Sequence, residues 1–159
     1  MADKLVPSTD DTGAIRRFRD MGDGTWAEVV SQAAGAAGAA GYPAGATPVT
    51  SASRVANAIA TATLAAAPGK MTYLSGLQIT GTGATAGGPI GIDVAGVVGA
   101  PMAFTLAVAT GAGVANTPLI IQFNPPIPAS ALNTAISVAV PALGAGNASS
   151  SVALQGFQL

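Results

Sequence analysis

Short apolar runs recur at regular intervals along the second two-thirds of the chain, and Gly, Pro, Asn or Ser ends each of them. The runs cover residues 55–65, 71–80, 90–98, 102–109, 118–124, 134–140 and 151–158. Evenly spaced short strands with turn residues between them are typical of antiparallel sandwiches and jelly rolls. The pattern therefore predicts an all-β domain over residues 55–159, an antiparallel β-sandwich or jelly roll.

Within several runs, large apolar side chains alternate with small or polar ones, as they do when one face of a strand is buried. The predicted inward sets are Ile90, Ile92 and Val94; Phe104, Leu106 and Val108; and Leu77 and Ile79 together with Met71 and Tyr73. The outward face is then Ala, Thr, Gly, Ser and Gln, a flat and uncharged surface suited to close packing. A helix competes with this interpretation only at the alanine-dense residues 53–67, and a short helical turn is possible at 128–133.

The N-terminal segment predicts a β-hairpin. Two β-prone runs, near residues 14–20 and 25–31, flank Gly22, Asp23 and Gly24, which tolerate positive φ. Charged residues of the two runs could pair across the strands, namely Arg17, Arg19, Asp20 and Glu28.

Between the hairpin and the sandwich, residues 33–54 are rich in Ala, Gly and Pro and have little to bury, so they predict a linker. Glycine recurs every third residue at positions 35, 38 and 41, but these triplets lack proline and are too few for a collagen helix. The predicted organisation is an arm with a hairpin at 1–32, a linker at 33–54 and a jelly-roll domain at 55–159.

Charge is concentrated at one end of the chain. Ten of the 13 charged residues lie in the first 28 positions, whereas residues 55–159 hold only Lys70 and Asp93. A surface so poor in ionisable groups predicts a subunit that is covered by neighbours in a larger assembly.

The composition also argues against several classes of function. The chain has no Cys and no His, which removes disulfides, thiolate chemistry, the commonest general base and the commonest transition-metal ligands. A net charge of −1 provides no long-range field for nucleic acid or anionic lipid. No membrane-spanning run and no secretory signal are expected, so the chain should be made in a cytoplasm.

Four patterns could carry chemistry, and each has a simpler interpretation. The glycine-rich residues 81–87 lead into another strand rather than the helix that a nucleotide site needs. Ser149, Ser150 and Ser151 have only Lys70 as a conceivable base. The N-terminal aspartates lack EF-hand spacing, and the Asn147-Ala-Ser149 sequon needs secretion. We therefore expect no enzyme activity, cofactor, metal or small-molecule substrate.

One basic and aromatic cluster remains as a candidate for protein interaction. The interpretations weighed are a nucleic-acid patch, ion pairs within the hairpin, and a docking contact with a charged partner surface. Nearby acidic residues disfavour nucleic acid, and the single Trp is either an anchor or a cap over the sandwich. The predicted contact residues are Arg16, Arg17, Phe18, Arg19, Asp20, Trp26 and Glu28.

The stretch from Arg17 to Val30, RFRDMGDGTWAEVV, resembles the N-terminal segment of small virion proteins of tailed bacteriophages. The body is similar to phage jelly-roll subunits at residues 69–81, 117–126, 144–147 and 156–159. The resemblance covers about 130 residues, and its motifs are structural rather than chemical.

The resemblance implies a capsid decoration, or cement, protein on the outer surface of a phage head. It implies a homo-oligomer, a trimer in preference to a dimer, that binds the major capsid protein. Alternatives with the same fold are a head-fibre or spike base and a tail or baseplate subunit, and a third alternative is a carbohydrate-binding recognition module.

Overall fold

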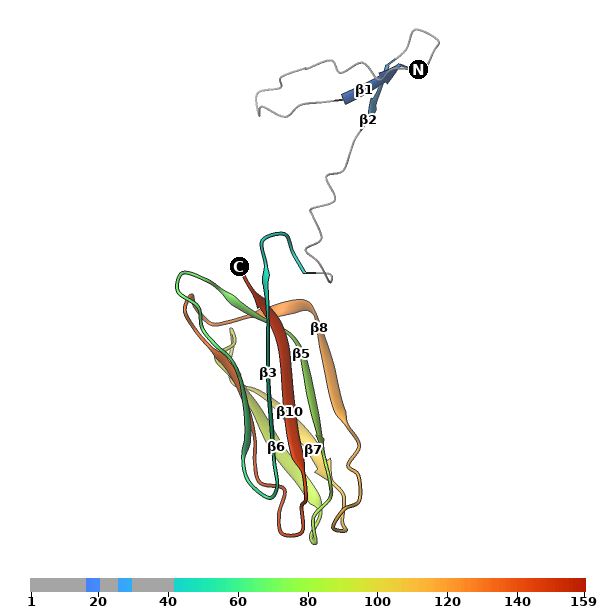
Figure 1. Ribbon diagram of the computed structural model, residues 1–159, viewed down its shortest axis with the longest axis vertical. Helices are drawn as coiled ribbons and strands as arrows, with labels where there is room; N and C mark the ends of the chain where they lie inside the picture. The colour runs from blue at the N-terminus through green and yellow to red at the C-terminus, as the bar shows by residue number, and fades with distance from the viewer. Residues whose placement is uncertain (1–16, 21–25, 30–41) are drawn as a thin grey trace. The chain divides into compact units, whose positions relative to one another are not determined.

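The computed structural model describes residues 17–20, 26–29 and 42–159, and this part of the chain forms ten β-strands and no helix (Figure 1). The strands are β1 (Arg17–Asp20), β2 (Trp26–Val29), β3 (Thr47–Val55), β4 (Ala60–Leu64), β5 (Thr72–Gly81), β6 (Gly88–Ala95), β7 (Met102–Val108), β8 (Leu119–Pro128), β9 (Ile136–Val140) and β10 (Ser150–Gln158). The expectation of an all-β chain is confirmed for the described residues.

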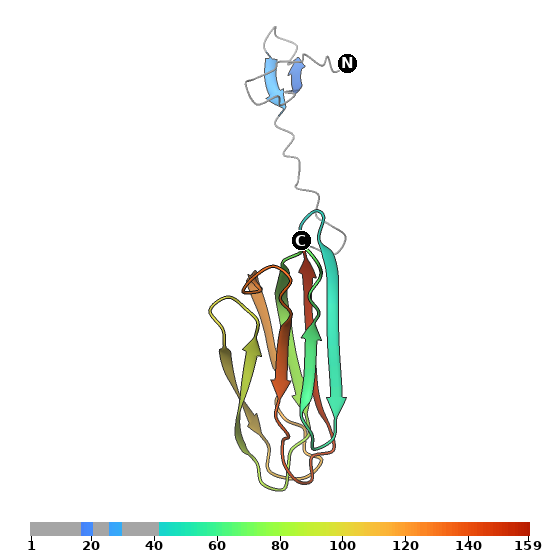
Figure 2. The ribbon, with the colours of Figure 1, turned by 90° about the vertical axis from the view of Figure 1, so that its left-hand side faces the viewer.

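Eight of these strands form two antiparallel sheets that pack face to face (Figures 1 and 2). One sheet has the order β3-β10-β5-β8 and the other the order β4-β9-β6-β7. Nearly all of the core between them is aliphatic, with Leu64, Leu77, Ile79, Ile92 and Val138 each at most 1% exposed. Each such side chain contributes roughly 1.5–3 kcal/mol to folding when fully buried, so the sheets are held together by apolar contact.

The predicted alternation is confirmed in β6 and β7. Ile92 and Val94 are buried and alternate with the exposed Gly91, Asp93 and Ala95. Leu106 and Val108 are buried as well, while Phe104 and Ile90 are half-buried at the rim of the core. Large residues therefore point into the sandwich and small ones point out.

The predicted face of β5 is wrong at its N-terminal end. Thr72 and Leu74 are buried there, whereas Tyr73 is only half-buried. The register of β5 shifts between Leu74 and Gly76. Against β10, Ser75 is the one extra residue, whereas against β8 the four residues 123–126 lie opposite Ser75. A bulge of this kind reverses which alternate residues face inward, so Tyr73 does not share the face of Leu77.

The first strand of the sandwich lies almost wholly in the predicted linker, residues 33–54. β3 covers residues 47–55 and pairs along its whole length with β10. Its inward positions are Val49, Ser51, Ser53 and Val55, all only half-buried because β3 is an edge strand. Serines on the inner face remove the apolar alternation by which a strand is recognised.

The helical alternatives are wrong. Residues 53–67 contain the end of β3 and all of β4, where alanine and leucine alternate with exposed threonine. Residues 128–133 end β8 and continue as a bend and a turn. Alanine is therefore used here as a small strand residue that allows close packing between the sheets.

The described part of the N-terminal region is a two-stranded antiparallel sheet. β1 and β2 lie within the predicted runs 14–20 and 25–31, and the turn between them is outside the described residues. Residues 1–44 and 45–159 form two separate compact units.

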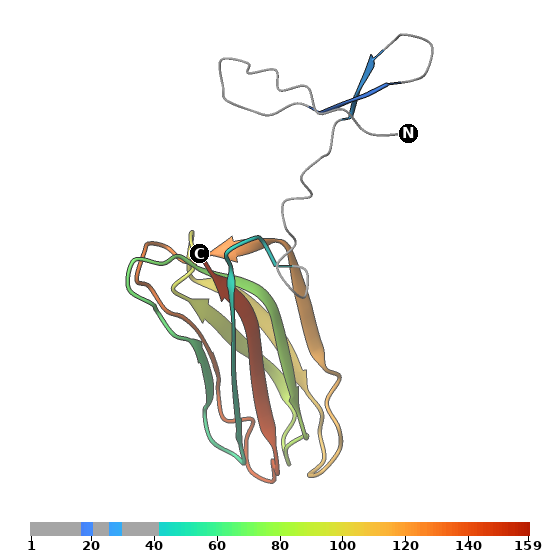
Figure 3. The ribbon, with the colours of Figure 1, turned by 45° about the horizontal axis from the view of Figure 1, so that its top comes forward.

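The strand directions place the connections at two ends of the sandwich. The C-terminus lies at the end where β3 begins (Figures 1 and 3). The connections 65–71, 96–101 and 129–135 are at this end, and 56–59, 82–87, 109–118 and 141–149 are at the other.

Candidate interaction surfaces

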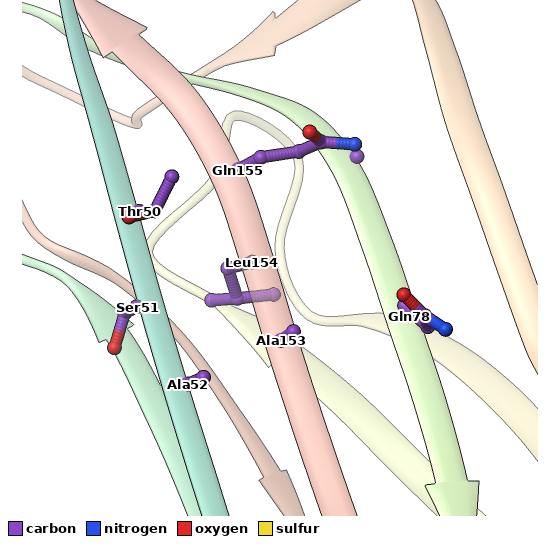
Figure 4. A pocket seen from close by; sticks show the side chains of 8 residues that line it. Thr50, Ser51, Ala52, Gln78, Ala153, Leu154 and Gln155 are labelled. Atoms are coloured by element: carbon purple, nitrogen blue, oxygen red, sulfur yellow. The ribbon is translucent and has the colours of Figure 1, made fainter.

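A shallow polar groove crosses the outer face of the β3-β10-β5-β8 sheet. It is lined by Thr50, Ser51 and Ala52 from β3, by Gly76 and Gln78 from β5, and by Ala153, Leu154 and Gln155 from β10. Figure 4 shows the Gln155 side chain reaching from β10 towards β5. No charged side chain is among the residues that line this groove.

The absence of a side chain at Gly76 shapes the groove. A Cβ there would lie 2.5 Å from Nε2 of Gln155 and 3.0 Å from Nε2 of Gln122. Gly76 is in register with both glutamines, which come from the strands on either side. The two amides therefore approach each other over β5 and form a surface that can both donate and accept hydrogen bonds.

A row of rings crosses the same sheet next to this groove. Phe157 is in register with Tyr73 on one side and with Pro48 on the other, and Tyr73 is in register with Pro128. The rings of Tyr73 and Phe157 are stacked, with centroids 4.8 Å apart and planes inclined by 11°. Phe157 is 3% exposed and Tyr73 half-buried, so the row offers limited aromatic area.

Arg54 lies beside a second depression at the other end of this face. The depression is lined by Arg54, Thr80, Gly81, Thr82, Ser149 and Ser151. Nε of Arg54 donates a hydrogen bond to Oγ of Ser149 at 3.0 Å, which orients the guanidinium.

The outer face of the β4-β9-β6-β7 sheet is flat. Its exposed strand residues are small, except for one carboxylate, and they are Thr61, Thr63, Gly88, Pro89, Gly91, Asp93, Ala95, Ala103, Thr105, Ala107 and Ala139. Asp93 is in register with Ala103 and Ala139. A second surface could approach this face closely without meeting a bulky side chain.

Charge is sparse over residues 42–159. The charged side chains there are Arg54, Lys70 and Asp93. Lys70 donates a hydrogen bond to Oγ1 of Thr47 at 3.4 Å in an exposed position. Nothing in this part of the chain concentrates charge into a patch, which agrees with the expectation from the sequence.

A network of buried amides joins the loops at the end opposite the C-terminus. Nδ2 of Asn147 donates to the carbonyl oxygens of Thr82 and Ser149, at 2.6 and 3.0 Å, and its Oδ1 accepts from the backbone N of Asn57. Asn116 is likewise buried and donates to the carbonyl of Thr82. Because the Asn147 side chain is 5% exposed and fully used, the sequon is not presented as an accessible glycan acceptor.

The serine and lysine that a hydrolase would need are far apart. Ser150 is in register with Gly81 at one end of β5, and Lys70 precedes Thr72 at its other end. Nine strand steps between residues 72 and 81 span about 30 Å. These residues therefore cannot form a Ser-Lys pair within one copy.

Residues 81–87 join β5 to β6, as the sequence analysis expected. Their backbone is held by hydrogen bonds from Thr82 N to Ser149 O and from Thr85 N to Ala145 O, both at 2.8 Å. The segment is thus a packed connection between strands, without the following helix that would bind a phosphate.

Ser150 offers a stability test within this end of the sandwich. Its Oγ is buried and has no hydrogen-bond partner in the described part of the chain. An unpaired buried hydroxyl costs about 1–3 kcal/mol, so Ser150→Ala should raise the free energy of unfolding by about 1 kcal/mol. Calorimetry should show a melting temperature higher by about 2–4 °C.

The matched control is Ser149→Ala, which removes the hydrogen bond from Arg54 and should not stabilise the protein. A lower melting temperature for Ser150→Ala than for Ser149→Ala would contradict the assignment of an unpaired hydroxyl.

The predicted contact residues of the N-terminal region lie on β1 and β2, except Arg16, which is outside the described residues. The register pairs Phe18 with Glu28 and Asp20 with Trp26. Arg17 and Arg19 are opposite Val29 and Ala27. No arginine of β1 is therefore directly opposite an acidic residue in this register.

Neither a metal site nor a membrane helix is found among the described residues. Within residues 17–20, 26–29 and 42–159, no three acidic residues come close enough to hold a metal ion. No helix in the same ranges is long and apolar enough to cross a membrane. The N-terminal aspartates 3, 10, 11 and 23 lie outside those ranges.

The chain was compared with protein-family models, with curated proteins and with solved structures. None of the three comparisons finds a match.

Proposed function

We propose that the protein is a non-enzymatic structural subunit of a tailed-phage virion, a decoration or cement protein on the outer surface of the head. It self-associates, as a trimer or a dimer, and binds the major capsid protein through its N-terminal arm. The observation that carries the proposal is the pair of broad sheet faces with one exposed charged side chain each, Arg54 and Asp93. Such faces are suited to permanent contact with neighbouring subunits.

We further propose that residues 45–159 are a jelly roll. The strand pairs β3·β10, β4·β9, β5·β8 and β6·β7 are all antiparallel. They are nested, as if one long hairpin closed by the β6–β7 turn had been rolled up. The additional pairs β10·β5 and β9·β6 then join the nested pairs into two four-stranded sheets, which supports an eight-stranded double Greek key.

The proposed attachment works through multivalency. Each arm makes a weak contact, and an oligomer brings several arms to the same shell, so the effective concentration of each arm is high. The arm contains ten of the 13 charged residues, and it therefore supplies the ionic part of the contact, while the sandwich supplies neutral packing surfaces.

Reversing two charges of the arm tests this division. In the Arg17→Glu, Arg19→Glu double variant, the apparent affinity for isolated heads should fall at least about tenfold. This corresponds to a loss of about 1.4 kcal/mol of binding free energy. The melting temperature of the sandwich should stay unchanged. Co-sedimentation with heads measures the first quantity and calorimetry the second; unchanged co-sedimentation would contradict a docking role for these arginines.

An alternative with the same fold and a different location in the virion is a head-fibre base or a tail subunit. Copy number separates the two, since a decoration protein is present at a fixed ratio to the major capsid protein and a tail part is far rarer.

The groove lined by Gln78, Gln155 and Thr50 favours a second candidate, a carbohydrate-binding recognition module. Amides and hydroxyls can hydrogen-bond to sugar hydroxyls, and the Tyr73–Phe157 stack is close by. Specific binding on a glycan array that is lost in Gln155→Ala would favour this candidate over the decoration protein.

A further inference from the structure

The four edge strands of the two sheets differ in how well they are protected against pairing with another strand. β8 contains three prolines, and β3 contains Pro48 and Arg54. β4 has five residues, and the backbone N of Thr63 donates to Oγ of Ser51 at 2.9 Å. Prolines, charges and short length are the usual ways in which edges are kept unpaired.

β7 has none of these features. It is seven residues long, MAFTLAV, with no proline and no charge. In the described part of the chain it pairs with β6 alone and is the last strand of its sheet. Every second backbone N–H and C=O of β7 therefore points away from the sheet, where another strand could pair with it.

The side chains of β7 form a pattern that reads the same in both directions about Thr105. The inward residues are all large and apolar, namely Met102, Phe104, Leu106 and Val108, and the exposed residues are small, namely Ala103, Thr105 and Ala107. Two copies of β7 placed antiparallel would therefore match large with large and small with small on both faces of the joint sheet.

We propose that two copies of the chain pair antiparallel through β7, about a two-fold axis at Thr105. Phe104 is then opposite the partner's Leu106, and Met102 is opposite the partner's Val108. The β4-β9-β6-β7 sheets of the two copies then form one continuous sheet of eight strands. Such an interface is isologous, as in most homodimers, and threonine opposite threonine is a favourable cross-strand pair.

Exposed apolar residues at both ends of β7 support the same arrangement. Val98, 58% exposed, lies in the connection before β7, and Val114, 49% exposed, lies in the connection after it. An antiparallel pair brings the Val98 connection of one copy next to the Val114 connection of the other. The half-buried Met102 and Phe104 are covered as well.

Electrostatic repulsion does not oppose this pairing. The nearest charged residue on the sheet is Asp93, which is in register with Ala103 one strand away from the edge. Across the proposed axis, the two Asp93 residues are three strand spacings apart across the joint sheet and four residues apart along the strands. The distance between them is therefore about 19 Å. That distance exceeds the Debye length of about 8 Å at physiological ionic strength.

The inference deepens the self-association part of the proposed function and selects the dimer over the trimer. It concerns the purified chain alone and does not depend on the phage head. Failure of the dimer and failure of head attachment are therefore separate results.

The first test places a charge on the axis. In full-length Thr105→Lys, two lysines would be directly opposite each other, so the dimer dissociation constant should rise at least about tenfold. Thr61→Lys is the matched control, since Thr61 is also an exposed threonine on an edge strand of the same sheet. Sedimentation equilibrium measures the constant, and circular dichroism checks the fold.

The second test uses the absence of native cysteine. Under mild oxidation, full-length Thr105→Cys should form a disulfide-linked dimer, because Cα atoms directly opposite in an antiparallel pair are about 4.5–5.5 Å apart. Thr61→Cys should remain largely uncrosslinked. This variant decides the outcome even if Thr105→Lys does not fold.

A monomeric or trimeric wild-type protein would overturn the proposal. So would equal weakening by Thr105→Lys and Thr61→Lys, or a Thr105→Cys variant that crosslinks no better than Thr61→Cys.

Discussion

Gly156→Val should destabilise the sandwich by about 3 kcal/mol or more, or prevent folding. Gly156 lies in the central strand β10, in register with Val49 on one side and Leu74 on the other. A Cβ at this position would collide with the carbonyl oxygen of Tyr73 and lie 2.9 Å from Cδ1 of Leu64. Overpacking a closed site costs typically about 1–3 kcal/mol, and here the backbone of the neighbouring strand would also have to move.

The matched control is Ala153→Val in the same strand. Ala153 lines the outer groove and is half-buried, so two added methyl groups have room, and β-branched residues suit strands. Urea unfolding should give a midpoint close to that of the wild type for Ala153→Val and a much lower one for Gly156→Val. Similar midpoints for the two variants would contradict the close approach of β5 to β10 at Gly156.

Deleting residues 1–32 should abolish attachment to heads and leave the sandwich folded. The deletion removes ten of the 13 charged residues and all of β1 and β2, but none of the eight strands of the two larger sheets. Among the described residues, the buried apolar side chains lie within residues 60–157, and Val49 and Val55, which pack against them, are also kept. The truncated protein should therefore keep the wild-type melting temperature and oligomeric state. Co-sedimentation with heads measures the loss of attachment.

The control for this deletion is the full-length chain carrying Arg54→Gln, which removes the cation of the sandwich's outer face and keeps the arm. It should co-sediment as the wild type does. Full occupancy of heads by the truncated protein would contradict the proposed tether. Loss of occupancy by the Arg54→Gln variant would indicate that the sandwich, and not only the arm, contacts the head.

Strand positions in the sandwich could be predicted from the sequence because turn residues bound the apolar runs. Residues 102–109 and 134–140, for example, contain β7 and β9 almost without error. The alternation of Phe104, Leu106 and Val108 also gave the correct inward face. These features depend on local pattern alone.

Two features could not be predicted because they depend on neighbouring strands. β3 has serines on its inner face, where Oγ of Ser51 accepts a hydrogen bond from β4, so its pattern does not look like a strand. The irregularity at Ser75 changes the inward face within β5, and no local residue pattern marks the change. Tyr73 therefore does not lie on the inward face that the alternation predicts for it.

The candidate surfaces were only partly visible in the sequence. The scarcity of charge on the outer faces could be predicted from composition and alternation, although each face has one exposed charged side chain, Arg54 or Asp93. The groove beside Gln155 requires the register that places Gly76 between two glutamines. The symmetric pattern of β7 could be read from the sequence, but its significance depends on β7 being an edge strand, which only the sheet order reveals.

The copy number of the chain in purified particles tests most directly whether it is a structural part of a virus particle. Particles purified from the cells that produce the chain can be analysed by quantitative mass spectrometry against their most abundant shell protein. We expect the chain at a constant, high ratio to that protein, retained through density-gradient purification. A chain that is absent from every particle fraction and sediments as a free monomer would contradict the proposal.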